Sequence, residues 1–334
     1  MKVLKGLLIA VAVLAGIYFV GPTPNTPVYN QNLPSIPAEP AQVEQYVKDM
    51  ESKVKVKPNN EARIIWANDS LKQKTEYAVL YLHGFSASQE EGTPVHLNFA
   101  SKFGSNLYLA RLSEHGLVSD EPMKEMTADK LWESAVEAYA IAKQLGNKVI
   151  ILSTSTGGTL SLMLCAKFPE IHSQLLLSPN IRIYDPNSKF LNDPWGMQIA
   201  KVVTGNDHIV TEDQRDIYKQ YWYSRYPLNA LPELQELLET GMTKENFSKV
   251  KQPTLMLYYY KNDEEQDKVV SVPAMKEMFE QISTPAALKK EVPIPTAGNH
   301  VIGGAIISKD IASVQNECEK FAIEVLNLIT VDKK

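Results

Sequence analysis

The sequence predicts an α/β fold with a mainly parallel sheet and helices on both of its faces, and three observations favour it. From about residue 62, short aliphatic and β-branched runs alternate with longer segments of helical composition, as in parallel strands joined by crossover helices. The alternation stops near residue 182 and resumes at residue 254. One predicted strand, residues 149–152, runs directly into a cluster of small residues and then into a helix-like segment.

The predicted strands are apolar runs of four to seven residues, many of them β-branched or aromatic. They cover residues 63–67, 77–82, 107–112, 149–152, 174–177, 254–260 and 290–294. The predicted helices are the longer segments between and after these strands, over residues 95–103, 127–145, 159–168, 273–282 and 309–329. A further helix is predicted from residue 41, where apolar residues from Val43 to Met50 recur three or four positions apart.

The first 22 residues differ from the rest of the chain. Two lysines precede an uninterrupted, mostly apolar run from Gly6 to Val20, whose length falls between that of a signal-peptide core and that of a bilayer span. Because Gly21-Pro22 makes a poor cleavage site, we expect residues 1–22 to be an uncleaved membrane anchor, with a cleaved signal peptide and export as the alternative. The lysines favour an N-terminus inside and the rest of the chain on the extracytoplasmic side.

The remaining chain divides by composition. Residues 23–40 are rich in proline and predict a semi-extended linker that holds the folded part away from the membrane. Residues 41–334 then form the folded domain. Within it, residues 182–250 contain weak helical segments and aromatic clusters in place of the alternation, so we expect an insertion there.

Composition excludes several classes of partner. The net charge of −5, with Lys and Arg spread along the chain, gives no basic field for nucleic acid. The two cysteines, Cys165 and Cys318, provide no metal-ligand spacing, and no Gly-rich phosphate loop is visible. We therefore expect no nucleic-acid partner, no metal and no cofactor, whereas the oligomeric state is not determined by the sequence.

The most informative stretch of the chain is the small-residue cluster that follows the strand at 149–152. It reads Ser153-Thr154-Ser155-Thr156-Gly157. A strand, a sharp turn and a helix lift one hydroxyl clear of the backbone and direct helix N–H groups toward whatever that hydroxyl attacks. Ser155 is therefore the candidate nucleophile, although a polar turn that only caps the following helix is the alternative interpretation.

This stretch resembles the nucleophile elbow, G-x-S-x-G, of the α/β-hydrolase superfamily, with Ser153 in the first Gly position. A second part of the resemblance is His83-Gly84-Phe85, directly after the predicted strand at 77–82. In that family an H-G turn supplies one oxyanion amide and the residue after the nucleophile supplies the other. The resemblance thus implies the backbone N–H groups of Phe85 and Thr156 as oxyanion donors, His83 as a structural residue, and residues 182–250 as a cap.

The family order of Ser, acid and His places the other two groups. His300 lies in a Gly-containing loop after the last predicted strand, where this fold presents its base. The acid follows the strand at 254–260, and two candidates remain. Asp267 precedes Val269-Val270 and matches the D-x-x-V pattern of the family, whereas Asp263 has the better register with the strand end. We prefer Asp267, since the valines can anchor its loop in the core.

The resemblance implies a serine hydrolase of the esterase or monoacylglycerol-lipase-like branch, with a Ser155-His300-Asp267 triad that cleaves carboxylic esters through an acyl-enzyme. Its expected substrate is a small-molecule or lipid-like ester, and its expected membrane contact is the N-terminal segment. Two alternatives stay open. One is a serine aminopeptidase-type amide hydrolase, and the other is a catalytically inactive binding module, which the Ser153 departure and the glycine-free acid loop leave possible.

Overall fold

A seven-stranded sheet forms the centre of the computed structural model, which describes residues 2–331. The strand order is β1-β3-β2-β4-β5-β8-β9, and every neighbouring pair is parallel except the antiparallel pair of β1 and β3. The strands are β1 (Arg63–Ile65), β2 (Thr75–Leu82), β3 (Asn106–Leu109), β4 (Gly146–Thr154), β5 (Ser173–Leu177), β8 (Thr254–Tyr258) and β9 (Lys289–Pro293). The predicted fold class, a mainly parallel sheet with helices on both faces, is confirmed.

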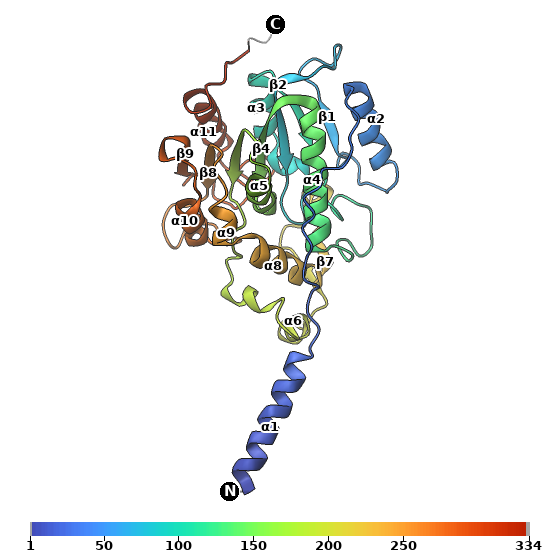
Figure 1. Cartoon of the computed structure of the whole chain (residues 1–334), viewed down its shortest axis with the longest axis vertical. Coiled ribbons are helices and arrows are strands. Elements are labelled where there is room, and N and C mark those ends of the chain that lie inside the picture. The colour runs from blue at the N-terminus through green and yellow to red at the C-terminus, as the bar shows by residue number, and fades with distance from the viewer. Residues whose placement is uncertain (1, 332–334) are drawn as a thin grey trace.

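Helices cover both faces of the sheet (Figure 1). The α-helices are α1 (Lys2–Phe19), α2 (Pro40–Glu51), α3 (Val95–Lys102), α4 (Ala128–Leu145), α5 (Thr156–Lys167), α6 (Gly196–Thr204), α7 (Asp216–Tyr221), α8 (Ala230–Gly241), α9 (Lys244–Phe247), α10 (Val272–Gln281) and α11 (Ile311–Glu324). Successive residues of a strand point to opposite faces. Accordingly, Leu80 of β2 packs in the core that holds α4, α5 and α10, whereas Tyr81 packs in the core that holds α3 and α11.

Residues 182–250, which we call the cap, separate β5 from β8. They contain the short helix η2 (Pro186–Phe190), α6, α7, α8 and α9, and an antiparallel pair of three-residue strands, β6 (His208–Val210) and β7 (Arg225–Pro227). Parts of the cap are anchored in the main core through buried apolar residues such as Leu237 and Phe247. The cap is thus packed onto the sheet domain at its α8–α9 end.

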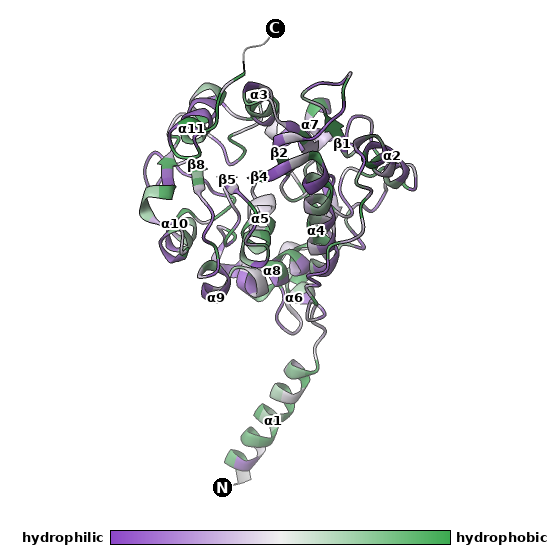
Figure 2. Ribbon diagram, turned by 45° about the horizontal axis from the view of Figure 1, so that its top comes forward, coloured by the Kyte–Doolittle hydropathy of each residue, from purple (hydrophilic) through white to green (hydrophobic). Residues whose placement is uncertain are grey.

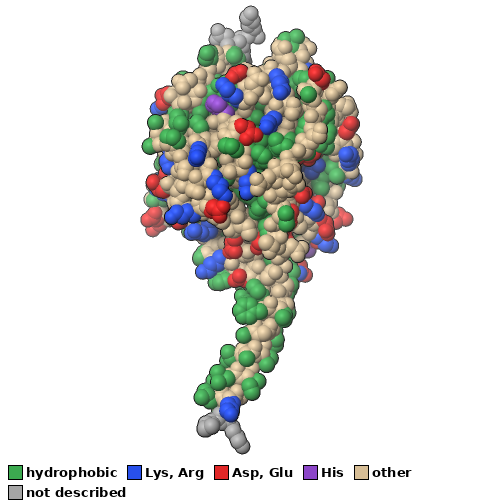
Figure 3. Space-filling model, viewed as in Figure 1, with side chains coloured by type: hydrophobic (Ala, Val, Ile, Leu, Met, Phe, Trp, Pro, Cys, Tyr) green, Lys and Arg blue, Asp and Glu red, His purple; other side chains and the backbone are tan. Residues whose placement is uncertain are grey.

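Helix α1 projects from the body and is mostly hydrophobic (Figure 2), and its large apolar side chains are exposed, many of them on the face seen in Figure 3. Within residues 2–331, no helix combines the length and the apolarity that crossing a membrane demands. The expected membrane anchor at residues 1–22 therefore has no support from the structure, and the expected extracytoplasmic location stays a prediction.

The proline-rich segment lies against the body and does not act as a free spacer. The Trp132 indole of α4 donates a hydrogen bond of 2.6 Å to the Asn30 carbonyl, and the hydroxyls of Tyr29 and Thr240 are 2.6 Å apart. The rings of Tyr29 and Trp132 meet edge to face with centroids 5.9 Å apart. The linker prediction did not foresee this docking. Its proline content predicts an extended backbone, whereas the contact depends on side chains such as Tyr29 that pack against a neighbouring helix.

Several predicted element boundaries differ from the structure by two or more residues, and two of these differences have a clear physical cause. The last helix, expected over residues 309–329, covers only Ile311–Glu324, because Asn327 takes a left-handed backbone conformation with φ of 55° and the chain turns away. The strand expected at 107–112 ends at Leu109, because the amide of Leu112 donates to the His83 side chain and not to a neighbouring strand.

Candidate active site

Ser155 lies in the turn between β4 and α5, and its backbone is strained. Its φ of 53° and ψ of −119° lie outside the regions that residues with a side chain normally adopt. Three backbone hydrogen bonds hold the turn. The Ser155 amide donates to the Leu177 carbonyl at 3.0 Å, and the Ser155 carbonyl accepts from the amides of Gly158 at 2.8 Å and Asn180 at 2.9 Å. The surrounding structure thus stabilises a conformation that presents the side chain at the end of the strand.

The small residues around Ser155 are required by close packing. A Cβ atom placed on Gly157 would lie 2.1 Å from the carbonyl oxygen of Leu82, and one on Gly158 would lie 2.7 Å from Cβ of Pro179. Ser153, which replaces the first Gly of the family motif, is fully buried in β4 with its hydroxyl 3.5 Å from the Leu175 carbonyl. The strand therefore accommodates a serine at that position without disturbing the turn.

The loop after β2 comes within contact distance of this turn. A Cβ atom placed on Gly84 would lie 2.9 Å from Cβ of Ser155. Thr156 is the first residue of α5, so its N–H is one of the unpaired amides of a helix N-terminus. Among the described residues, the amides of Phe85 and Thr156 have no hydrogen-bond partner. The two predicted oxyanion donors thus lie on the segments that meet at Ser155.

Two buried histidines hold the loop of residues 83–86 in place. Nε2 of His83 accepts a hydrogen bond from the Leu112 amide at 3.1 Å, and Nε2 of His115 accepts one from the Ser86 amide at 3.0 Å. Burial, helped by the neighbouring His115, lowers the pKa of His83 to about 3, and burial lowers the pKa of His115 to about 4. Both rings are therefore neutral acceptors that shape the loop.

His300 and Asp267 are brought together by the loops after β9 and β8. The Nδ1–H of His300 donates to Oδ2 of Asp267 at 2.6 Å, and the other carboxylate oxygen accepts from the amides of Val269 at 2.9 Å and Val270 at 3.0 Å. Burial lowers the pKa of His300, but the charge of Asp267 and the hydrogen bond to it outweigh burial, so the pKa is raised overall. Asp267 is 1% exposed and His300 8% exposed.

Asp263 takes no part in this pair. Its carboxylate is exposed and accepts a hydrogen bond of 2.8 Å from the hydroxyl of Tyr260. Of the two valines expected to anchor the acid loop, Val270 is fully buried, whereas Val269 is about half exposed. The anchor of Asp267 is therefore one apolar side chain together with two backbone amides.

The predicted residues lie at the same edge of the sheet, where the structure joins His300 to Asp267 by a hydrogen bond and gives Ser155 none to either. Ser155 follows β4, Asp267 follows β8, His300 follows β9 and the Gly84 loop follows β2, and these four strands are parallel. The carboxyl ends of parallel strands all open onto the same edge, which is where α/β sheets place their ligand sites. Ser155 is only 6% exposed, so this edge is covered.

Two contacts at this edge were not predicted. The Glu91 side chain, in the short helix η1 (Gln89–Gly92), is buried and accepts a hydrogen bond from the Gly84 amide at 2.5 Å. The cap residue Tyr223 donates its amide hydrogen to the Ser86 carbonyl at 2.8 Å. Glu91 stands in a polar Ser-Gln-Glu-Glu run that gives no sign of burial, and the contact of Tyr223 is made by its backbone, whose partner no side-chain pattern indicates.

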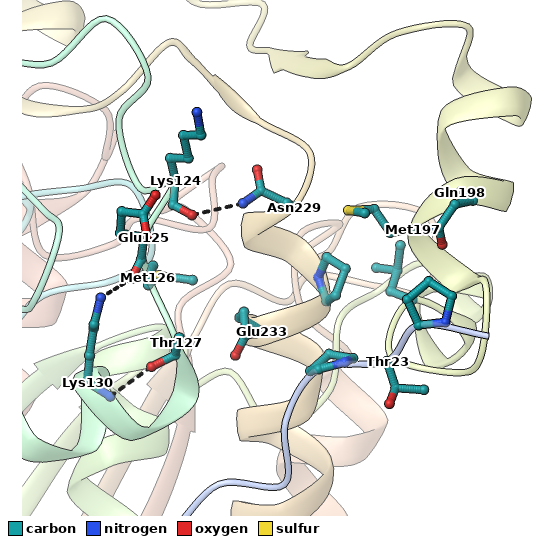
Figure 4. A pocket seen from close by; sticks show the side chains of 14 residues that line it. Thr23, Lys124, Glu125, Met126, Thr127, Lys130, Met197, Gln198, Asn229 and Glu233 are labelled. Carbon is teal, nitrogen blue, oxygen red and sulfur yellow. Dashed lines mark hydrogen bonds between the residues drawn. The ribbon is translucent and has the colours of Figure 1, made fainter. Parts of the chain in front are cut away.

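A separate cavity of about 270 Å³ lies between the proline-rich segment, the start of α4, α6 and α8. Figure 4 shows its lining, with Glu233 of α8 and Lys130 of α4 on one side and Met197 of α6 on the other. Neither Ser155 nor His300 lines it, so it is distinct from the edge described above. Within residues 2–331, no cluster of three or more His, Cys, Asp or Glu side chains is arranged to hold a metal ion.

Comparison with known proteins identifies the fold through structure. No protein-family model matches the chain, and no curated protein matches it in sequence. A metagenome-derived lipolytic enzyme of the pair LipS and LipT superposes with a TM-score of 0.61 at 18% identity, covering 80% of this chain and 98% of its own. The monoacylglycerol lipase of Paleococcus ferrophilus superposes with a TM-score of 0.53 at 12% identity, and the match covers 78% of this chain and 99% of the lipase. Est1E of Butyrivibrio proteoclasticus, solved with ferulic acid, superposes with a TM-score of 0.52 at 16% identity, and the match covers 80% of this chain and 95% of Est1E. The sheet order, the strained turn at Ser155 and these structural neighbours together show that the chain has the α/β-hydrolase fold.

Proposed function

We propose that the protein is a serine hydrolase that cleaves carboxylic esters through an acyl-enzyme. Ser155 is the nucleophile, His300 is the general base and Asp267 is the carboxylate that orients the base. The observation that carries the proposal is the strained turn at Ser155 together with the buried His300–Asp267 pair at the same sheet edge. Strain at a single serine is retained only where the surrounding structure enforces it, and such positions cluster at active sites.

The geometry supports a two-step mechanism. Ser155 Oγ attacks the ester carbonyl carbon while Nε2 of His300 takes its proton, and the carbonyl oxygen becomes an oxyanion bound by the amides of Phe85 and Thr156. The C–O bond to the leaving alcohol then breaks, and the alkoxide takes the proton from His300. Water repeats the sequence on the acyl-enzyme, which releases the carboxylic acid and restores the Ser155 hydroxyl.

Asp267 determines which His300 nitrogen is available. Because Nδ1–H is held by the Asp267 carboxylate, Nε2 carries the lone pair that accepts the serine proton. The buried carboxylate also stabilises the imidazolium that forms in the transition state. The two backbone amides on the other oxygen hold the Asp267 carboxylate in the orientation that faces the ring.

The names of the structural neighbours support an ester as the substrate. They include a lipolytic enzyme, a monoacylglycerol lipase and Est1E with bound ferulic acid. An aromatic residue of the cap next to the loop of Phe85 would give an acyl or aryl group an apolar contact. The Tyr226 ring, for example, lies 5.5 Å from the Phe85 ring. We therefore propose a small-molecule or lipid-like carboxylic ester as the substrate class.

A fluorophosphonate probe and two substrate panels test the proposal. The intact protein is expected to be labelled at one serine and to hydrolyse p-nitrophenyl esters, whereas aminoacyl nitroanilides are expected to be poor substrates. Peptide mapping of the labelled protein should place the probe on Ser155. Absence of labelling would indicate an inactive binding module, and faster cleavage of the anilides than of the esters would indicate an amide hydrolase.

The pH profile of ester hydrolysis should report His300. The base must be neutral to accept a proton, so kcat/KM is expected to be low at acid pH and to rise as pH passes through the pKa of His300. Because the Asp267 carboxylate raises that pKa, the rise should lie above the ordinary imidazole range of ~6.5. A profile that stays flat from pH 5 to 9, measured with a neutral ester, would contradict a histidine base.

A further inference from the structure

Glu91 places a buried carboxylate directly behind the predicted oxyanion loop. Its side chain is 2% exposed, and Oε2 accepts a hydrogen bond from the Gly84 amide at 2.5 Å. A Cβ atom placed on Gly84 would lie 3.0 Å from both Glu91 carboxylate oxygens and 2.9 Å from Cβ of Ser155. The carboxylate, Gly84 and the nucleophile are therefore packed against one another, without room for an intervening side chain.

The peptide groups around Gly84 are held from two sides. Glu91 binds its N–H, and the His83 ring binds its carbonyl oxygen at 2.9 Å. That carbonyl belongs to the same planar peptide group as the N–H of Phe85, which points the opposite way in a trans peptide. Fixing both sides of Gly84 thus sets the direction of the Phe85 amide. Without these two hydrogen bonds that direction would vary, because glycine has a wide conformational range.

The same short helix also holds the loop that carries His300. The Thr93 carbonyl, directly after η1, accepts a hydrogen bond from the Ala305 amide at 2.8 Å. A Cβ atom placed on Gly304 would lie 2.5 Å from the carbonyl oxygen of Glu91. One turn of chain therefore contacts both the loop of the oxyanion donor and the loop of the base.

We propose that Glu91 is a positioning residue that fixes the oxyanion amide of Phe85 through Gly84 and places a negative charge near His300. This role deepens the proposed function and rests on it. Loss of the carboxylate leaves the Gly84 amide buried without a partner, so the loop is expected to relax and the Phe85 amide to lose its aim. The negative charge of Glu91 favours the imidazolium form of His300, as the carboxylate of Asp267 does.

Several groups face the Glu91 carboxylate. The indole of Trp222 in the cap lies beside it, and the carboxylate is near enough to His300, to Tyr81 of β2 and to Tyr218 of α7 for its negative charge to act on them. Burial raises the pKa of Glu91 to about 7, against the opposing effects of the Gly84 amide, His300 and Trp222. The negative charge of Glu91 thus favours protonated His300, and the positive charge of His300 favours ionised Glu91.

Two substitutions at position 91 separate the roles of the hydrogen bond and of the charge. Glu91→Ala removes the acceptor for Gly84, and we expect kcat to fall about 10²- to 10³-fold with little change in KM, the cost of losing one oxyanion donor. Glu91→Gln keeps an oxygen for the Gly84 amide, so it should restore most of kcat. Because it removes the negative charge near His300, the pKa of the base should fall, and the acid limb of kcat/KM should move to lower pH.

The matched control is Glu90→Ala, which removes the neighbouring carboxylate of η1. That carboxylate accepts a hydrogen bond from the Thr93 hydroxyl and not from the Gly84 amide. It should leave kcat and the pH profile unchanged. Equal losses in Glu90→Ala and Glu91→Ala, or an acid limb that does not move in Glu91→Gln, would overturn the proposal. Should Glu91→Ala fail to fold, the pH profile of Glu91→Gln decides alone. Fluorophosphonate labelling of the wild-type protein separates failure of this proposal from failure of the proposed function. An active triad should be labelled whether or not Glu91 positions the Phe85 amide.

Discussion

Ser155→Ala is expected to abolish ester hydrolysis, with a loss in kcat of roughly 10⁴- to 10⁶-fold, as in well-studied serine hydrolases. The substitution removes only the hydroxyl oxygen, and the backbone bonds of Ser155 to Leu177, Gly158 and Asn180 are unaffected. The fold should therefore persist, which circular dichroism and the thermal midpoint would check. Initial rates with p-nitrophenyl esters and fluorophosphonate labelling measure the loss.

Ser153→Ala is the matched control, since Ser153 is buried in β4 two residues before Ser155. It should keep both activity and labelling. Persistent labelling in Ser155→Ala, at Ser153 or at another serine, would show that the nucleophile is misassigned. Combining Ser155→Ala with His300→Ala should cost no more than either change alone, because base and nucleophile act as a unit.

Asp267→Asn is expected to lower kcat by up to ~10⁴-fold. The neutral amide cannot stabilise the imidazolium of His300, and its NH₂ group can favour the tautomer with the proton on the wrong nitrogen. Both amides that now bind the Asp267 carboxylate, those of Val269 and Val270, can still reach the asparagine oxygen. The loop should thus stay in place, and the effect should appear in kcat more than in KM.

Asp263→Asn provides the comparison for the acid. Its carboxylate is exposed and binds only the Tyr260 hydroxyl and not His300, so its kcat/KM should stay within about twofold of the wild type, as for most surface substitutions. Steady-state kinetics of the two variants on one ester rank the candidates. A greater loss in Asp263→Asn than in Asp267→Asn would mean that another arrangement of the acid loop operates during turnover.

The sequence predicted the sheet and the positions at its edge because those signals are local. Ser155, Asp267 and His300 each lie in the segment that follows a predicted strand, and parallel strands bring such segments to one edge without any knowledge of packing. The turn at Ser155 was visible for the same reason, since only small residues fit beside the Leu82 carbonyl.

Features that depend on contacts between distant segments were not predictable in this way. Glu91 is buried because η1 folds back between the loops of Gly84 and Gly304, and nothing in its own neighbourhood in the sequence differs from a solvated acidic loop. The docking of Tyr29 on α4 and α8 likewise depends on a partner about a hundred or more residues away. Propensity and periodicity describe a residue's neighbours in the chain, whereas burial of a charge is a property of the assembled fold.

The hydrogen bond from the Tyr223 amide to the Ser86 carbonyl joins the cap to the loop that carries Phe85. The cap backbone and this loop are therefore mechanically linked, not independent parts of the molecule. A substitution that displaces the cap at Tyr223 is expected to displace the loop of residues 83–86 as well, so the region that covers the proposed site also determines the shape of its proposed oxyanion side.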